Sequence, residues 1–142
     1  MSDNAFVDTN ILVYARDAAA GEKQVRAAAL LDELWRSRRG RISVQVLNEY
    51  FVTVTQKLRP GMPHEAAWSD VAALRAWDPV SLDWPLTEQA HLLRGQYALS
   101  WWDALVVAAA ELADCSTLYS EDLTHGATYG HVQVVNPFRR PG

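Results

Sequence analysis

The sequence predicts a single α/β domain with a central parallel sheet flanked by helices. Short apolar runs that suit buried strands alternate with longer segments of helical periodicity, and this alternation is typical of parallel sheets covered by helices. The chain has 142 residues, a length that suits one domain over residues 1–142. It contains no internal repeat, linker or low-complexity segment that would divide it.

Turn and capping residues divide the first half of the chain into elements. A polar Asp-Thr-Asn turn follows the first apolar run, Gly40 follows a long segment of helical periodicity, and Ser43 is a suitable helix N-cap. The expected elements are strands over residues 5–7 and 41–43, and helices from Ile11, over 22–38 and over 44–57.

The second half of the chain is divided in the same way. Residues 59–63 are rich in proline and glycine, Pro79 interrupts the next helical pattern, and Ser100 is the N-cap of another helix. The expected elements are helices over residues 64–77, 87–99 and 101–113, and strands over 80–82, 117–119 and 132–135.

Four acidic residues are the candidate site: Asp8, Glu49, Asp103 and Asp122. Asp8 and Asp122 directly follow strands, and the ligand crevice of such sheets lies at the carboxyl ends of the strands. Carboxylates that gather in one pocket repel each other, so the fold must protonate some of them or bind a cation. Oxygen ligands alone suit Mg²⁺ or Mn²⁺, and carboxylate-held ions of this kind indicate phosphate chemistry.

Each candidate also has a purely structural interpretation. Asp8 can be a helix N-cap, Asp103 can complete a capping arrangement with Ser100, and Glu49 can be a solvated position on its helix. Glu121 competes with Asp122, because neighbouring residues cannot both point the same way.

Three polar residues adjoin the acids: Thr9, Asn10 and Ser120. They can orient carboxylates or bind a metal-held water, and they can equally make turn and capping hydrogen bonds.

Composition excludes several classes of protein. The net charge of −4 and the pI of about 5.5 argue against a general nucleic-acid coat, although metal ions can supply local positive charge in a nuclease. The single cysteine excludes an internal disulfide and fits a reducing compartment. With neither a signal peptide nor a long apolar run, we expect a cytoplasmic protein that does not enter the membrane.

The densest basic run consists of Arg36, Arg38, Arg39 and Arg41. It resembles a phosphate-binding patch. However, it enters the second strand at its amino end, away from the expected crevice. It is therefore interpreted as a solvated surface or as a remote contact for RNA or a protein partner.

In four stretches around these acids, and in its last strand, the chain resembles PIN-domain ribonucleases of the VapC family, the toxins of bacterial type II toxin–antitoxin pairs. The stretches are Phe-Val-Asp-Thr-Asn-Ile-Leu-Val-Tyr from residue 6, Ser-Val-Gln-Val-Leu-Asn-Glu-Tyr-Phe from 43, Leu-Ser-Trp-Trp-Asp-Ala-Leu from 99, Leu-Tyr-Ser-Glu-Asp-Leu from 118 and Val-Val-Asn-Pro-Phe from 134. The similarity covers roughly residues 4–138.

The resemblance implies a parallel sheet of about five strands, Mg²⁺ or Mn²⁺ as the cation and RNA as the substrate. It assigns the metal-binding quartet to Asp8, Glu49, Asp103 and Asp122. It also implies a homodimer and a cognate antitoxin that covers the active-site groove.

A metal-dependent ribonuclease, as the toxin of such a pair, is therefore the first functional hypothesis. The alternative is a metal-binding PIN module with little nuclease activity that acts through a protein partner. An aspartyl phosphatase is disfavoured because Asn10 stands where that chemistry needs a second acid. A phosphoreceiver is disfavoured because no lysine follows Lys57.

Overall fold

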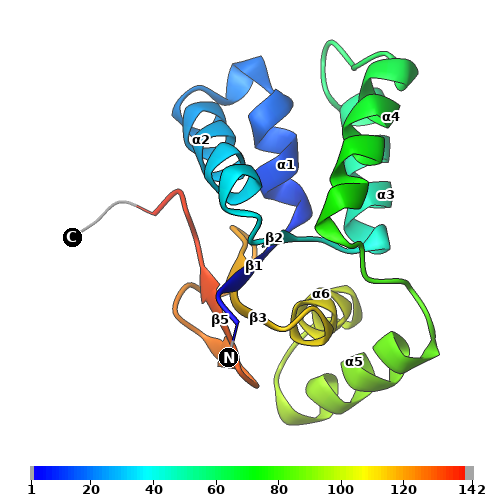
Figure 1. Ribbon diagram of the computed structural model, residues 1–142, viewed down its shortest axis with the longest axis vertical. Coiled ribbons are helices and arrows are strands. Elements are labelled where there is room, and N and C mark those ends of the chain that lie inside the picture. The colour runs from blue at the N-terminus through cyan, green and yellow to red at the C-terminus, as the bar shows by residue number, and fades with distance from the viewer. Residues whose placement is uncertain (1, 140–142) are drawn as a thin grey trace.

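Five strands form one sheet in the computed structural model, which describes residues 2–139 (Figure 1). The strand order is β2-β1-β3-β5-β4, and all neighbours are parallel except β4 and β5. The strands are β1 (Asn4–Val7), β2 (Gly40–Arg41), β3 (Cys115–Tyr119), β4 (Thr128–Tyr129) and β5 (Val132–Val135). The predicted α/β class, with a largely parallel central sheet flanked by helices, is confirmed.

Six α-helices pack around the sheet as sequential pairs, which Figure 1 shows as α1 with α2, α3 with α4 and α5 with α6. None of the helices within the described residues is long and apolar enough to cross a membrane. The α-helices are α1 (Thr9–Arg16), α2 (Glu22–Ser37), α3 (Val44–Val52), α4 (His64–Ala73), α5 (Trp84–Gln96) and α6 (Trp101–Leu112). Shorter helical turns are η1 (Ala18–Ala20), the π-helical η2 (Thr53–Lys57) and η3 (Leu74–Trp77).

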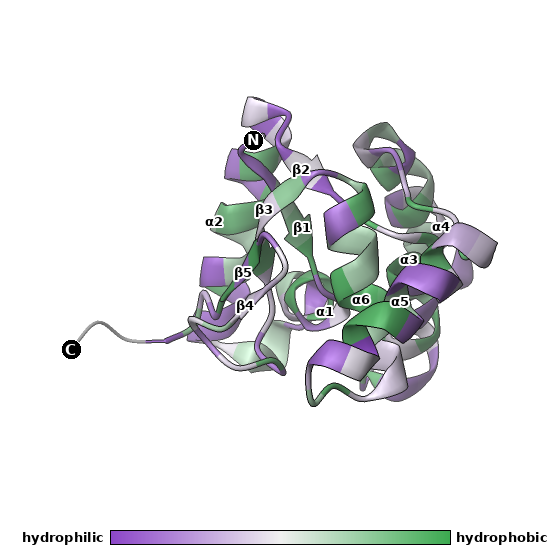
Figure 2. Cartoon of the chain, turned by 90° about the horizontal axis from the view of Figure 1, so that it is seen from below, coloured by the Kyte–Doolittle hydropathy of each residue, from purple (hydrophilic) through white to green (hydrophobic). Residues whose placement is uncertain are grey.

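The core includes the sheet and α6, together with buried residues of the other five α-helices. Residues 104–110 of α6 are all buried, so this helix is apolar on every side along its middle. Phe6 of β1 and Leu118 of β3 are fully buried beside it. Figure 2 shows the same hydrophobic centre, with hydrophilic residues on the outer helices.

The strand expected over residues 80–82 is wrong. Val80 forms only an isolated parallel bridge with Ser43. Pro79 lacks a backbone N–H, and Leu82 is exposed, so the run neither extends into a ladder nor buries a face. The fifth strand is instead β4, which pairs antiparallel with β5 across a turn at Gly130 and His131.

Several other boundaries differ from the expectation, and capping residues account for two of them. The second strand is Gly40–Arg41, and Ser43 serves as the N-cap of α3, where its hydroxyl oxygen accepts a hydrogen bond from the Val46 N–H. The helix expected from residue 87 begins at Trp84, because the Asp83 carboxylate accepts a hydrogen bond from the Leu86 N–H.

One carboxylate ties three helices together. Asp70 of α4 receives two hydrogen bonds from the Arg16 guanidinium of α1 and one from the Tyr50 hydroxyl of α3. Tyr50 is buried, and burial and the Asp70 contact raise its pKa. The tie therefore fixes α1, α3 and α4 relative to one another.

Candidate active site

Asp8 lies at the carboxyl end of β1 and is the N-cap of α1, so the capping interpretation is confirmed and the position is also compatible with a metal ligand. Its Oδ1 accepts a hydrogen bond from the Thr9 N–H at 2.8 Å, and its Oδ2 accepts one from Ser120 Oγ at 2.8 Å. The Asp8 N–H donates to the Tyr119 carbonyl at 3.0 Å, which joins the ends of β1 and β3. The side chain is only 7% exposed.

Burial raises the pKa of Asp8 to about 6. Desolvation is the main cause, because a low-dielectric surrounding disfavours the charged carboxylate. The hydrogen bonds from Ser120 and Thr9 lower the pKa, while the negative charges of Asp122 and Glu49 raise it. Asp8 is therefore a buried acid that feels the charge of two of the other candidates.

Asp122 is positioned by the turn that follows β3. Its backbone N–H donates to Ser120 Oγ at 3.1 Å, and its Oδ2 accepts from Asn10 Nδ2 at 3.0 Å. Ser120 is fully buried, and its hydroxyl group connects Asp8 to the backbone of Asp122 through these two hydrogen bonds. These contacts link the ends of β1 and β3 through Ser120 and Asn10.

Glu121 is engaged elsewhere. Its carboxylate forms an ion pair with Lys23 Nζ and accepts a hydrogen bond from the Tyr14 hydroxyl. Partial burial alone would raise its pKa, but the hydrogen bonds from Lys23 and Tyr14 more than offset this, so the pKa of Glu121 lies below its ordinary value. This geometry favours Asp122 as the fourth candidate acid. The roles of Lys23 and Tyr14 could not be predicted from sequence, because both residues lie far from Glu121 along the chain.

Glu49 is exposed on α3, where its Oε1 accepts a hydrogen bond from Gln45 Nε2 at 2.9 Å. A cavity of about 480 Å³ lies beside it, lined by Gln45, Asn48, Glu49, Leu82 and Trp102. The contact between Glu49 and Gln45 was missed from sequence, although the spacing of four helical residues was a usable signal.

Asp103 lies in the first turn of α6. Its backbone N–H donates to Ser100 Oγ at 3.1 Å, as the capping interpretation expects. Its side chain is partly exposed.

The site fits a divalent cation in its donor chemistry but does not form a closed cage. Within residues 2–139, no three His, Cys, Asp or Glu side chains lie close enough together to hold a metal ion. Mg²⁺ commonly takes one or two protein carboxylates and keeps several waters, which this arrangement can satisfy. Thr9 Oγ1, next to Asp8 in the chain, is buried without a hydrogen-bond partner among the described residues.

Comparison with known proteins identifies the fold. Residues 5–129 match the PIN domain family. A chain from a toxin–antitoxin complex of Klebsiella pneumoniae is similar, with a TM-score of 0.67 and 22% identity over 96% of this chain and 100% of that chain. A search of curated protein sequences found no match.

Two further solved structures are similar. VapC20 of Mycobacterium tuberculosis, described as a sarcin-ricin loop cleaving toxin, has a TM-score of 0.59 and 22% identity over 84% of this chain and 90% of that chain. A chain of VapBC2 from Rickettsia felis, bound to a promoter DNA fragment, has a TM-score of 0.61 and 17% identity over 92% of this chain and 96% of that chain. At these identities the likeness shows the fold alone. The family match spans most of the chain and agrees with the sequence resemblance, so this protein belongs to the PIN domain family.

Proposed function

We propose that this protein is a metal-dependent ribonuclease that hydrolyses RNA phosphodiester bonds and acts as the toxin of a toxin–antitoxin pair. The observation that carries the proposal is the buried Asp8 carboxyl, which lies at the ends of the parallel strands within reach of the charges of Asp122 and Glu49. Similar folds occur in a toxin–antitoxin complex and in an RNA-cleaving toxin, which supports the substrate class.

In this proposal Asp8, Asp103 and Asp122 would hold Mg²⁺ or Mn²⁺, in part through waters. The ion would lower the pKa of a water and offset negative charge in the transition state. Glu49, on the open side of the site, would orient the attacking water or help to hold a second ion.

The polar neighbours would hold the carboxylates in place. Ser120 and the Thr9 N–H fix the two oxygens of Asp8, and Asn10 fixes Asp122. Glu121 would act indirectly, since its contacts with Lys23 and Tyr14 anchor the turn that carries Asp122.

A cleavage assay with Mg²⁺, Mn²⁺ or EDTA tests the proposal. We expect the wild type to cut single-stranded RNA with either metal and not in EDTA, and Asp8→Asn and Asp122→Asn to lose activity. Water is the nucleophile, so the products should carry no 2′,3′-cyclic phosphate.

Glu121→Gln is the matched control, because it removes the neighbouring negative charge and should lose only part of the cleavage activity, through the weakened contact with Lys23. Activity that persists in excess EDTA, or that is equal in the wild type and Asp122→Asn, would contradict the proposal.

The proposed protein partners are a cognate antitoxin and a second copy of the chain, and the proposed location is the cytoplasm. An exposed apolar surface supports protein contacts: Trp68 is 62% exposed and lines a cavity with Val44, Leu47, Phe51 and Val71. The similar structures from toxin–antitoxin complexes favour the same idea. If the protein binds metal and a partner but neither cuts RNA nor arrests growth, the binding-module alternative holds.

A further inference from the structure

The basic run between residues 36 and 41 contains two kinds of arginine. Arg36 and Arg39 form ion pairs with acidic side chains of α2. Arg38 and Arg41 have no carboxylate partner within the described part of the chain, and Arg41 donates to the carbonyl oxygens of Arg38 and Gly40. Two uncompensated guanidinium groups in a protein of net charge −4 mark a local basic site.

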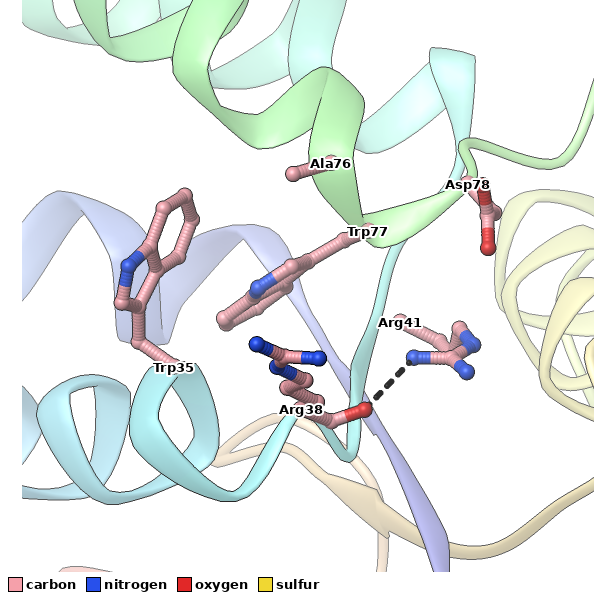
Figure 3. A pocket seen from close by; sticks show the side chains of 6 residues that line it. All are labelled: Trp35, Arg38, Arg41, Ala76, Trp77 and Asp78. Atoms are coloured by element: carbon pink, nitrogen blue, oxygen red, sulfur yellow. Dashed lines mark hydrogen bonds between the residues drawn. The ribbon is translucent and has the colours of Figure 1, made fainter.

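Arg38 and Arg41 line the same cavity, which has a volume of about 360 Å³. Figure 3 shows the Arg38 guanidinium beside the ring of Trp77, with Trp35 facing it and Asp78 at the other end. The volume is within the range of roughly 300–1,000 Å³ typical of small-ligand sites. The cavity therefore brings positive charge, aromatic surface and one acceptor group together.

Two sides of this cavity, Trp77 and Arg41, are held in place by packing and hydrogen bonds. Trp77 is buried and lies so close to Gly40 that an added Cβ there would be 2.5 Å from its ring. Arg38 ends α2 in the left-handed conformation, with φ 61°. Arg41 is held at 2.7 Å from the Gly40 carbonyl oxygen and at 3.1 Å from the Arg38 carbonyl oxygen.

We propose that this cavity binds a nucleotide unit of a single-stranded nucleic acid. Guanidinium groups bind phosphate through charge-assisted hydrogen bonds, and indole rings stack on bases of any sequence. Asp78 disfavours a bare anion but accepts N–H or O–H donors, which a base or ribose carries. A nucleotide can contact the guanidinium groups, an indole ring and the Asp78 carboxylate at once. Inorganic phosphate and an acidic peptide can contact fewer of these groups.

The base stacks on the outer face of Trp35. The centroids of the Trp35 and Trp77 rings are 6.0 Å apart, the separation of a direct aromatic pair, which leaves no room for a base between them. Trp35 is 47% exposed, so part of its side chain is accessible to a base. The cavity contains none of the four candidate acids, so the inference concerns binding and does not depend on cleavage.

Fluorescence anisotropy with a labelled, non-cleavable 2′-O-methyl RNA tests the proposal. Arg38→Gln and Arg41→Gln should each weaken binding about tenfold, as expected for a lost hydrogen bond to a charged group. They should also reduce the salt dependence by about one phosphate contact each. Arg36→Gln removes the same charge from an ion-paired position and should bind as the wild type does.

Trp35→Ala should weaken binding by about fivefold to a hundredfold, and Trp35→Phe should restore most of it. Competition by AMP or GMP with the same pattern of variants would identify free nucleotides as ligands of the same site. Equal losses in Arg36→Gln and Arg38→Gln, or full binding by Trp35→Ala, would overturn the proposal. Displacement by an acidic peptide but not by mononucleotides would also overturn it, in favour of a protein partner.

Discussion

The Ser120 hydroxyl donates a hydrogen bond to the Asp8 carboxylate, 112 residues away in the sequence, with 2.8 Å between Oγ and Oδ2. The same oxygen accepts the backbone N–H of Asp122. One buried hydroxyl thus connects two candidate acids and holds the ends of β1 and β3 together.

Ser120→Ala should destabilise the protein by about 1–3 kcal/mol, because it leaves buried partners without their hydrogen bond. It should also raise the pKa of Asp8 further, since the Ser120 hydrogen bond lowers that pKa. Chemical denaturation measures the first effect, and carboxyl NMR titration measures the second. An unchanged Asp8 pKa in the variant would contradict the assigned contact.

The raised pKa of Asp8 predicts a specific pH dependence in EDTA. Between the ordinary pKa of 3.8 and about 6, the folded protein keeps a proton on Asp8 that the unfolded chain has lost. The free energy of unfolding should therefore fall as pH rises through this window, by about 3 kcal/mol from this group. Asp8→Asn should lose this slope and be more stable than the wild type at pH 7.

Metal addition should offset the loss of stability that comes from ionising the buried Asp8. Mg²⁺ should raise the melting temperature of the wild type more at pH 7 than at pH 5, where protons compete for Asp8. Asp8→Asn should show a much smaller metal effect at both values. Equal stabilisation of the two proteins would place the bound ion elsewhere.

Lys23→Ala should loosen the turn after β3 without removing a candidate acid. Its loss leaves Glu121 held by Tyr14 alone, so the pKa of Glu121 should rise. Cleavage by this variant should weaken only partly, whereas Asp122→Asn should abolish it. Comparing the two kcat values checks the distinction, and complete loss in Lys23→Ala would contradict it.

Gly40→Ala should destabilise the protein by about 1–3 kcal/mol, because the new methyl group overlaps the buried ring of Trp77. Gly95→Ala is the matched control, since nothing lies within 4 Å of an added Cβ there. Gly95 lies in the last turn of α5, so alanine there should be neutral or stabilise by up to about 0.5 kcal/mol. Thermal unfolding measures the change in stability of each variant, and an unchanged stability in Gly40→Ala would argue against this packing.

Local sequence patterns predicted the helices and the central strands well, because apolar periodicity and capping residues such as Ser43 and Ser100 act over a few residues. They missed β4, whose two residues become a strand only by pairing with β5. They misplaced a strand at Val80, whose apolar neighbour Leu82 proved to be exposed.

The candidate acids could be named from the sequence, but their surroundings could not. Glu121 and Asp122 are adjacent and chemically alike, and only the distant Lys23 and Tyr14 distinguish them. Arg36 could be distinguished from Arg38 locally, because Asp32 lies four residues before it on the same helix. The position of Arg38 depends on how the chain turns after α2.

The tie at Asp70 has a consequence for the site. Asp8 begins α1, and Glu49 belongs to α3, the two helices that Asp70 joins through Arg16 and Tyr50. The separation of these two acids is therefore governed partly by a residue that takes no part in the chemistry. Neutralising Asp70 should misalign them from a distance and lower turnover even though every candidate ligand is still present.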